Sequence, residues 1–220
     1  MTKRYEFHTH TILSDGELLP IELIRRASVI GIGVVAITDH AGAGNIEWLI
    51  SSLKGDCDLA EDFGVIAIPG VELTHIPPKR IPALAKRAKK AGADIVVVHG
   101  ETTVEPVPPL TNRWSVDCPD VDVLAHPGLL TLRDAERARD NGIFIELTSR
   151  KGHSLTNGHV ARIALKAGAQ TVVNTDAHAP GELITFEFAR KVATGAGLSE
   201  PEVQRALVSN PKALMKRIGY

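Results

Sequence analysis

Short runs of apolar, mostly β-branched residues recur along this chain, and between them apolar residues return every three or four positions. Such runs are typical of buried strands, and the segments between them have the pattern of amphipathic helices. Strands and helices that alternate in this way favour an α/β fold whose helices cover a parallel sheet. Seven strands are predicted, at residues 5–7, 34–38, 65–68, 95–98, 123–125, 143–147 and 171–175.

Helices are predicted at residues 20–30, 45–53, 82–91, 132–141, 158–167 and 183–194. Glycines stand where four of these helices should end in left-handed backbone, at Gly31, Gly92, Gly142 and Gly168. The usual β/α barrel has eight strands and about 250 residues, so this chain of 220 residues is one unit short. We therefore expect a single domain over residues 1–220, a distorted seven-stranded (β/α)7 TIM-like barrel. Residues 200–220 should form two short helices against one end of it.

Polar side chains of one chemical kind follow the predicted strands. His8 and His10 lie two residues apart, so an extended backbone points both imidazoles to one face, and a Ser-Asp-Gly turn brings Asp15 close. Further imidazoles and carboxylates follow the later strands at His40, Glu72, His99, His126, Asp176 and His178. Parallel strands of a barrel place such residues on one rim. The pattern therefore predicts a metal site there.

Composition narrows the choice of partners. The chain has 25 basic and 26 acidic residues, so it carries no broad positive surface for nucleic acid or anionic membranes. No apolar stretch reaches about 18 residues, and the chain starts without a signal sequence. Cys57 and Cys118 lack a Cys-x-x-Cys context, which fits a reducing compartment. We expect a cytoplasmic protein with no membrane or nucleic-acid partner, and the sequence does not indicate its oligomeric state.

Six ordered motifs carry a resemblance to the PHP (polymerase and histidinol phosphatase) superfamily of metal-dependent phosphoesterases. They are His-Thr-His-Thr-x-x-Ser-Asp-Gly at 8–16, Thr-Asp-His at 38–40, Gly-Val-Glu at 70–72, His-Gly-Glu at 99–101, Ala-His-Pro at 125–127 and Asn-Thr-Asp-Ala-His at 174–178. The resemblance implies two to three divalent ions. The implied ligands are His8, His10, Glu72 and Asp176 for the first ion, Glu72, His99 and His126 for the second, and Asp15, His40 and His178 for the third.

The resemblance implies hydrolysis of a small phosphorylated substrate, such as a histidinol-phosphate-like phosphomonoester, by a metal-activated hydroxide. Imidazole and carboxylate ligands suit zinc, manganese or iron, and the sequence does not choose among them. Charge that develops on the phosphoryl oxygens requires a cation nearby. Arg150, in the loop after the sixth strand, is the candidate phosphate ligand, and His153 in the same loop is a candidate proton donor.

Two alternatives stay open. The first is a PHP nuclease or nucleotide phosphatase. The resemblance implies an additional domain in such enzymes, and the 31 residues between His40 and Glu72 leave no room for it, so this alternative is disfavoured. A noncatalytic RNA-protein subunit, like the PHP-related protein of ribonuclease P, would need no complete ligand set. The sequence therefore favours a metal-dependent phosphatase, an enzyme of the hydrolase class.

Overall fold

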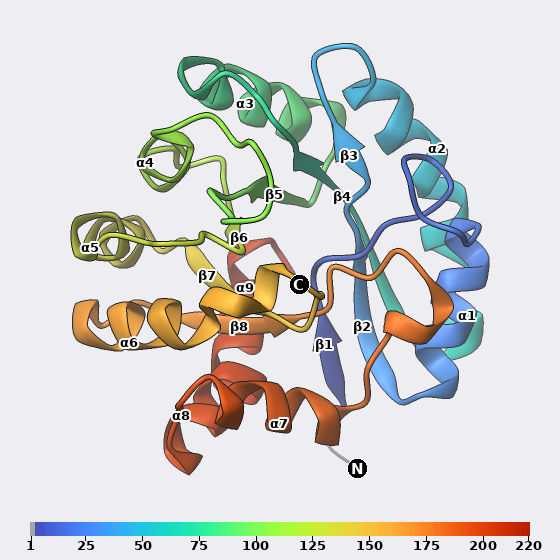
Figure 1. The fold of residues 1–220 in the computed structure, drawn as a ribbon. Coiled ribbons are helices and arrows are strands. Elements are labelled where there is room, and N and C mark those ends of the chain that lie inside the picture. Colours follow the sequence, from blue (N-terminus) through green and yellow to red (C-terminus); the bar gives the residue numbers. More distant parts are fainter. Residues whose placement is uncertain (1–2) are drawn as a thin grey trace.

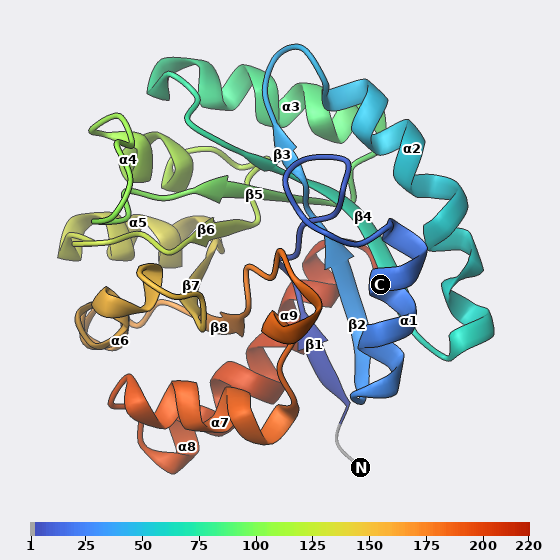
Figure 2. The same cartoon turned by 45° about the vertical axis from the view of Figure 1, so that its right-hand side comes forward.

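The computed structural model describes residues 3–220 and has at its centre a nearly closed barrel of parallel strands (Figures 1 and 2). The seven predicted strands are confirmed, and each is hydrogen-bonded to the next in chain order. They are β1 (Arg4–Glu6), β2 (Ile32–Ile37), β4 (Ile66–Leu73), β5 (Ile95–His99), β6 (Val123–Ala125), β7 (Phe144–Thr148) and β8 (Thr171–Asn174). Because all seven run parallel, their carboxyl ends share one rim.

Two elements were not predicted. The short strand β3 (His40–Ala41) pairs with β4 and sets His40 beside Glu72. The helix α4 (Thr111–Val116) lies between β5 and β6, where the sequence predicted no helix. Both are too short to leave a hydrophobic period in the sequence. The first of them matters for the site, because it brings two proposed metal ligands into register.

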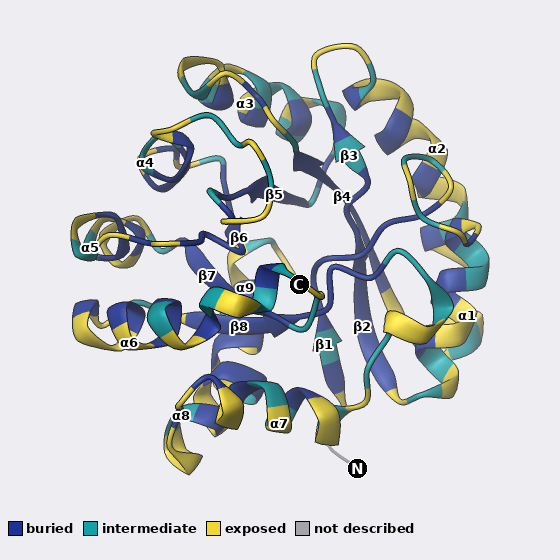
Figure 3. Ribbon diagram, viewed as in Figure 1, coloured by how far each residue is buried: buried dark blue, intermediate teal, exposed yellow. Residues whose placement is uncertain are grey.

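The helices pack around the outside of the barrel, with buried inner faces and exposed outer faces (Figure 3). They are α1 (Pro20–Val29), α2 (Ile46–Asp58), α3 (Ile81–Ala91), α5 (Leu132–Asn141), α6 (Asn157–Ala167) and α7 (Phe186–Gly195). In α1, for example, Leu23, Ile24 and Ala27 are buried. Helix α2 extends beyond the predicted end at residue 53. Left-handed Gly142 and Gly168 end α5 and α6 as predicted.

The C-terminal segment packs against one end of the barrel, as predicted, and the structure shows that this is the amino end of the strands. It consists of α8 (Glu200–Gln204), a π-helical turn (Arg205–Ser209) and α9 (Asn210–Arg217). Leu214 and Met215 of α9 are buried in one cluster with Ile95, Val123 and Phe144, the first residues of β5, β6 and β7. Apolar side chains therefore fill this end, and the polar strand ends lie at the opposite one.

The seam between β8 and β1 is held by single contacts, because no strand ladder joins these two within residues 3–220. The Asp176 N–H donates to the His8 carbonyl at 2.9 Å. The buried Glu6 carboxylate, paired with Arg4, accepts from the N–H groups of His8 and Thr175 at 3.1 and 3.0 Å. These bonds fix two proposed ligands, His8 and Asp176, side by side at the rim.

Candidate metal centre

The structure brings all nine predicted ligands together at the carboxyl rim of the barrel. Each comes from a strand end or from the loop that follows it, so the barrel geometry alone makes them converge. Eight of them, all but Asp176, form three overlapping groups that resemble the three implied ion sites. The groups are His10, Asp15, His40 and His178; His8, His10 and Glu72; and Glu72, His99 and His126.

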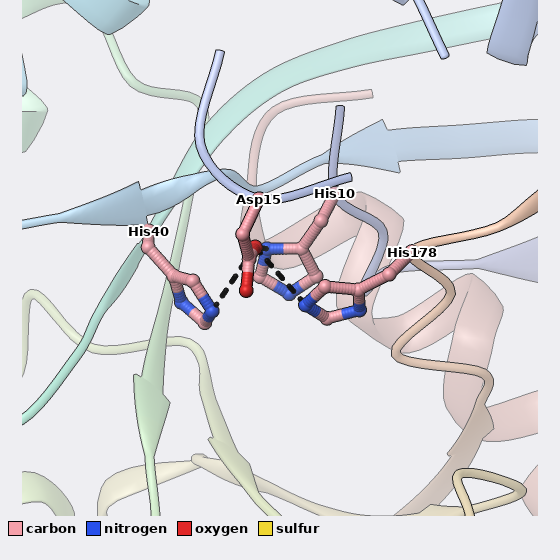
Figure 4. A group of neighbouring side chains, drawn as sticks. All are labelled: His10, Asp15, His40 and His178. Atoms are coloured by element: carbon pink, nitrogen blue, oxygen red, sulfur yellow. Dashed lines mark ion pairs between the residues drawn. The ribbon is translucent and has the colours of Figure 1, made fainter. Parts of the chain in front are cut away.

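Figure 4 shows the Asp15 group, in which three of the four side chains are partly exposed and His10 is buried. The Asp15 carboxylate sits between two rings, with Oδ1 3.1 Å from Nε2 of His178 and 3.4 Å from Nε2 of His40. Its side chain is 55% exposed, whereas the His10 side chain is fully buried. Burial alone would raise the pKa of Asp15, but the hydrogen bonds from His178 and His40 hold this pKa well below its usual range.

Glu72 is fully buried, belongs to two of the three groups and contacts the third through His40. Its Oε1 is 3.3 Å from Nε2 of His8 and 3.6 Å from Nε2 of His126, while its Oε2 is 2.7 Å from Nδ1 of His40. Asp176, the remaining proposed ligand, lies 3.1 Å from Nε2 of His10. One carboxylate thus faces ligands of different groups, which is the position that a bridging ligand would occupy.

The hydrogen bonding of His8 fits a cation at this place. Its Nδ1 lies 2.8 Å from Oε2 of Glu146, so the ring donates there and Nε2 is the nitrogen left for a cation. Nε2 lies 3.3 Å from Oε1 of Glu72, and neither atom has a hydrogen-bond partner within the described residues. Nε2 of His10 is buried and unpartnered as well. Buried polar atoms are rarely left unpaired, and a divalent ion would satisfy all three.

The carboxylates around the histidines also affect the pKa values of the imidazoles. Burial opposes a charge on His8 and His40, but the surrounding carboxylates raise both pKa values, that of His40 to about 10 through Glu72 above all. Burial lowers the pKa of His10 to about 4. Ligand imidazoles must be neutral, so a cation would displace protons from His8 and His40 on binding.

Two carboxylates that hold the ligands in place were missed as site residues. Glu146 of β7 accepts from His8 and, at 2.9 Å, from Asn174. Asp39 accepts from the Thr11 N–H at 2.7 Å and from the Ser14 hydroxyl at 2.6 Å, which orders the loop that carries Asp15. For Glu146 the available signal was a carboxylate within an apolar strand, since a buried charge needs partners, and for Asp39 it was the Thr-Asp-His motif at 38–40.

Arg150 and His153 lie at the rim, where the sequence predicted them. Nη1 of Arg150 donates to the Asp176 carbonyl at 2.9 Å, and its side chain is 25% exposed. His153 is buried, with Nδ1 2.8 Å from the Thr102 hydroxyl oxygen. Burial, together with the neighbouring His126, lowers the pKa of His153 to about 4. Both residues line a cavity of about 280 Å³, together with Asp15, His40 and His178.

The chain is similar to other proteins over nearly its whole length. No family model matches the chain. An uncharacterised protein of Methanocaldococcus jannaschii is 52% identical over 217 residues, which cover 98% of this chain and 100% of that protein. A probable phosphatase of Thermoanaerobacter sp. is 28% identical over 230 residues, 95% of this chain and 93% of the relative.

Solved structures share the fold. A chain of an archaeal ribonuclease P solved with mature tRNA superposes with a TM-score of 0.70 at 17% identity, over 98% of this chain and 92% of that one. The histidinol phosphate phosphatase of Lactococcus lactis, solved with zinc, L-histidinol and phosphate, gives 0.59 at 13% identity, over 99% and 94%. With the parallel barrel and the ligand groups at its rim, these likenesses show that the chain has the fold of the PHP superfamily, a distorted β/α barrel. Within residues 3–220, no helix is long and apolar enough to cross a membrane.

Proposed function

We propose that this protein is a metal-dependent phosphomonoesterase that hydrolyses a small phosphorylated metabolite. The observation that carries the proposal is that Arg150 lines the same cavity as Asp15, His40 and Asp176. Imidazoles and carboxylates that suit divalent ions thus stand beside a guanidinium that suits a phosphate. At about 280 Å³, the cavity matches a small ligand rather than a polymer.

The nine rim ligands would hold two to three zinc, manganese or iron ions, with Glu72 shared between the first two. When bound, such ions supply an activated water and stabilise negative charge on the phosphoryl and leaving oxygens. Glu146 keeps the His8 proton on Nδ1 and so leaves Nε2 free. Asp39 holds the Thr11 to Ser14 turn in place, and this turn sets the position of Asp15.

Arg150 would bind the substrate phosphate. Its contacts with Asp176 and Glu182 use Nε and Nη1, and within the described residues Nη2 makes no hydrogen bond. Donors therefore remain for phosphate oxygens. His153 is the proposed proton donor to the leaving oxygen. Since its pKa is low, it would be a strong acid once protonated, and a substrate with negative charge would favour that protonation.

The test is a phosphatase screen of the purified protein over a panel of phosphorylated metabolites, with manganese, zinc or iron added back. We expect turnover of at least one phosphomonoester and its loss on treatment with a chelator. Protein that has taken up metal and hydrolyses nothing on the panel would contradict the proposal.

A second candidate is a subunit of an RNA-protein complex, which the likeness to the ribonuclease P chain favours. At 17% identity that likeness concerns the fold, and the balanced charge argues against RNA binding. A mobility-shift experiment with tRNA separates the candidates. Our proposal expects binding no tighter than about micromolar, the range of nonspecific contacts, and salt-resistant nanomolar binding would favour the subunit.

A further inference from the structure

Two ligand-type side chains at the mouth of the cavity belong to none of the three proposed ion sites. They are His75, just after β4, and Glu105, in the loop after β5. Oε2 of Glu105 lies 3.0 Å from Nε2 of His99 and 3.2 Å from Nε2 of His75, and its Oε1 lies 3.3 Å from Nε2 of His153. His75, His99 and Glu105 form a compact group of potential metal ligands.

The loop that carries Glu105 is anchored at its base. Glu101 and Asn112 exchange hydrogen bonds of 3.0 and 2.8 Å, which join the two ends of the loop. The turn at Gly128 packs against it so closely that a Cβ there would lie 1.8 Å from the Glu101 carbonyl oxygen. The base therefore holds the tip, with Glu105, over the cavity.

His75 is also held in an unusual way. Its backbone has a φ of +51°, in the left-handed region that residues other than glycine seldom adopt. Within the described residues, only three other non-glycine residues have positive φ, and two of them are the proposed ligands His126 and Asp176. His75 thus shares a backbone feature with residues of the metal centre.

His99 connects this outer group to the inner one. Its Nδ1 lies 3.2 Å from the Gly100 carbonyl oxygen, so the ring donates there and only Nε2 can bind a cation. Oε2 of Glu105 lies 3.0 Å from this nitrogen, and His99 also belongs to the group with Glu72 and His126, so the same nitrogen would have to serve both groups. A single ion could use it from either side, but two ions could not use it together.

The exposure of the side chains decreases from the outer group to the inner one. The side chains of His75 and Glu105 are 38% and 37% exposed, that of His99 is 4% exposed, and that of Glu72 is fully buried. Two imidazoles and one carboxylate are a donor set found around zinc. An ion that arrives from solvent would meet the outer ligands before the inner ones.

We propose that His75, Glu105 and His99 form an outer site for a divalent transition-metal ion, and that His99 passes the ion from there to Glu72 and His126. The proposal rests on the metal centre proposed above. It makes the loop after β5 an entry route for the second ion. A purely structural role, in which the imidazoles only hold the loop closed, would leave the rate of metal uptake unchanged.

The experiment measures zinc uptake by the chelator-stripped full chain in stopped flow, with a fluorescent zinc indicator and elemental analysis at the end. Glu105→Gln and His75→Ala should each slow the uptake of one equivalent by about tenfold, with the same final content as the wild type. Glu17→Gln is the matched control, because it removes one exposed rim carboxylate whose side chain makes no hydrogen bond or ion pair within residues 3–220. Its uptake rate should equal that of the wild type.

Unchanged uptake in both variants would overturn the proposal. So would a loss of one whole equivalent at equilibrium, because His75 and Glu105 would then be resident ligands rather than an entry site. A wild-type chain that takes up no zinc at all would instead refute the metal centre itself, and the two failures are therefore distinguishable. Since either variant alone can decide the outcome, one that fails to fold does not prevent the test.

Discussion

The inner half of the metal centre, around Glu72, and the outer half, around Asp15 and Glu105, hold their side chains by different means. Inner ligands such as His8 are fully buried and fixed by a partner, in this case Glu146. Asp15 and Glu105 extend from loops, are 55% and 37% exposed, and are positioned by the histidines that they contact. The inner ligands are therefore held in place by buried residues of the barrel, whereas the outer ones are held only by contacts with the ligand histidines themselves. Substitutions in the two halves should affect metal content differently.

The largest effect is expected for Glu72→Ala. Because Oε1 of Glu72 faces both His8 and His126, its loss should remove more than one metal equivalent and lower turnover by at least about a thousandfold. Elemental analysis alongside kinetics measures both quantities, with circular dichroism as the control for folding. Loss of a single equivalent would show that Glu72 does not bridge two ions.

Asp15→Ala should remove one equivalent and leave the other two. Its carboxylate contacts only His10, His40 and His178 among the described residues, and its exposure means that the core does not depend on it. Turnover should fall strongly, because the third ion is lost. A metal count that drops to zero would contradict the separation of outer and inner sites.

Glu146→Gln should weaken metal binding without abolishing it. A glutamine amide can donate to Nδ1 of His8, which would move the ring proton to Nε2, the nitrogen meant for the ion. We expect affinity for one ion to fall about 10- to 100-fold, as is usual for partners of metal-ligating histidines. Competition with a chelator measures it, and Glu17→Gln should match the wild type. Equal affinities in Glu146→Gln and wild type would rule out this role.

Arg150→Ala should leave the metal content unchanged and act on the substrate alone. A charge-assisted contact to phosphate contributes about 1.5 to 3 kcal/mol, so kcat/KM should fall by roughly ten- to hundredfold. The neighbouring Lys151→Ala is the control and should have little effect. Near wild-type kinetics in Arg150→Ala, or a loss of metal, would reject Arg150 as the phosphate ligand and direct attention to Lys151 or His153.

The inner and outer halves also differ in how far the sequence revealed them. His99 and His126 could be predicted because each follows an apolar run, and the parallel barrel then makes them converge. The same pattern gave the seven strands and the helices between them. It could not give β3 or α4, which are too short for a hydrophobic period to repeat clearly.

Residues that act on the ligands were harder to find. Glu146 lies within a strand and Glu105 within a loop without regular spacing, so no motif marks either of them. Their positions depend on tertiary contacts, with His8 in one case and with three histidines in the other. Asp15 could be predicted because the Ser-Asp-Gly turn follows the histidine pair directly.

The metal content of the gently purified wild-type chain, measured by elemental analysis before and after reconstitution, decides whether the rim is a multinuclear metal centre. Nine ligand side chains exceed what one ion can bind, and a cation would satisfy both Nε2 of His8 and Oε1 of Glu72, which have no hydrogen-bond partner within residues 3–220. We expect two to three transition-metal ions per chain. One ion or none, even after reconstitution, would contradict a multinuclear centre at this rim.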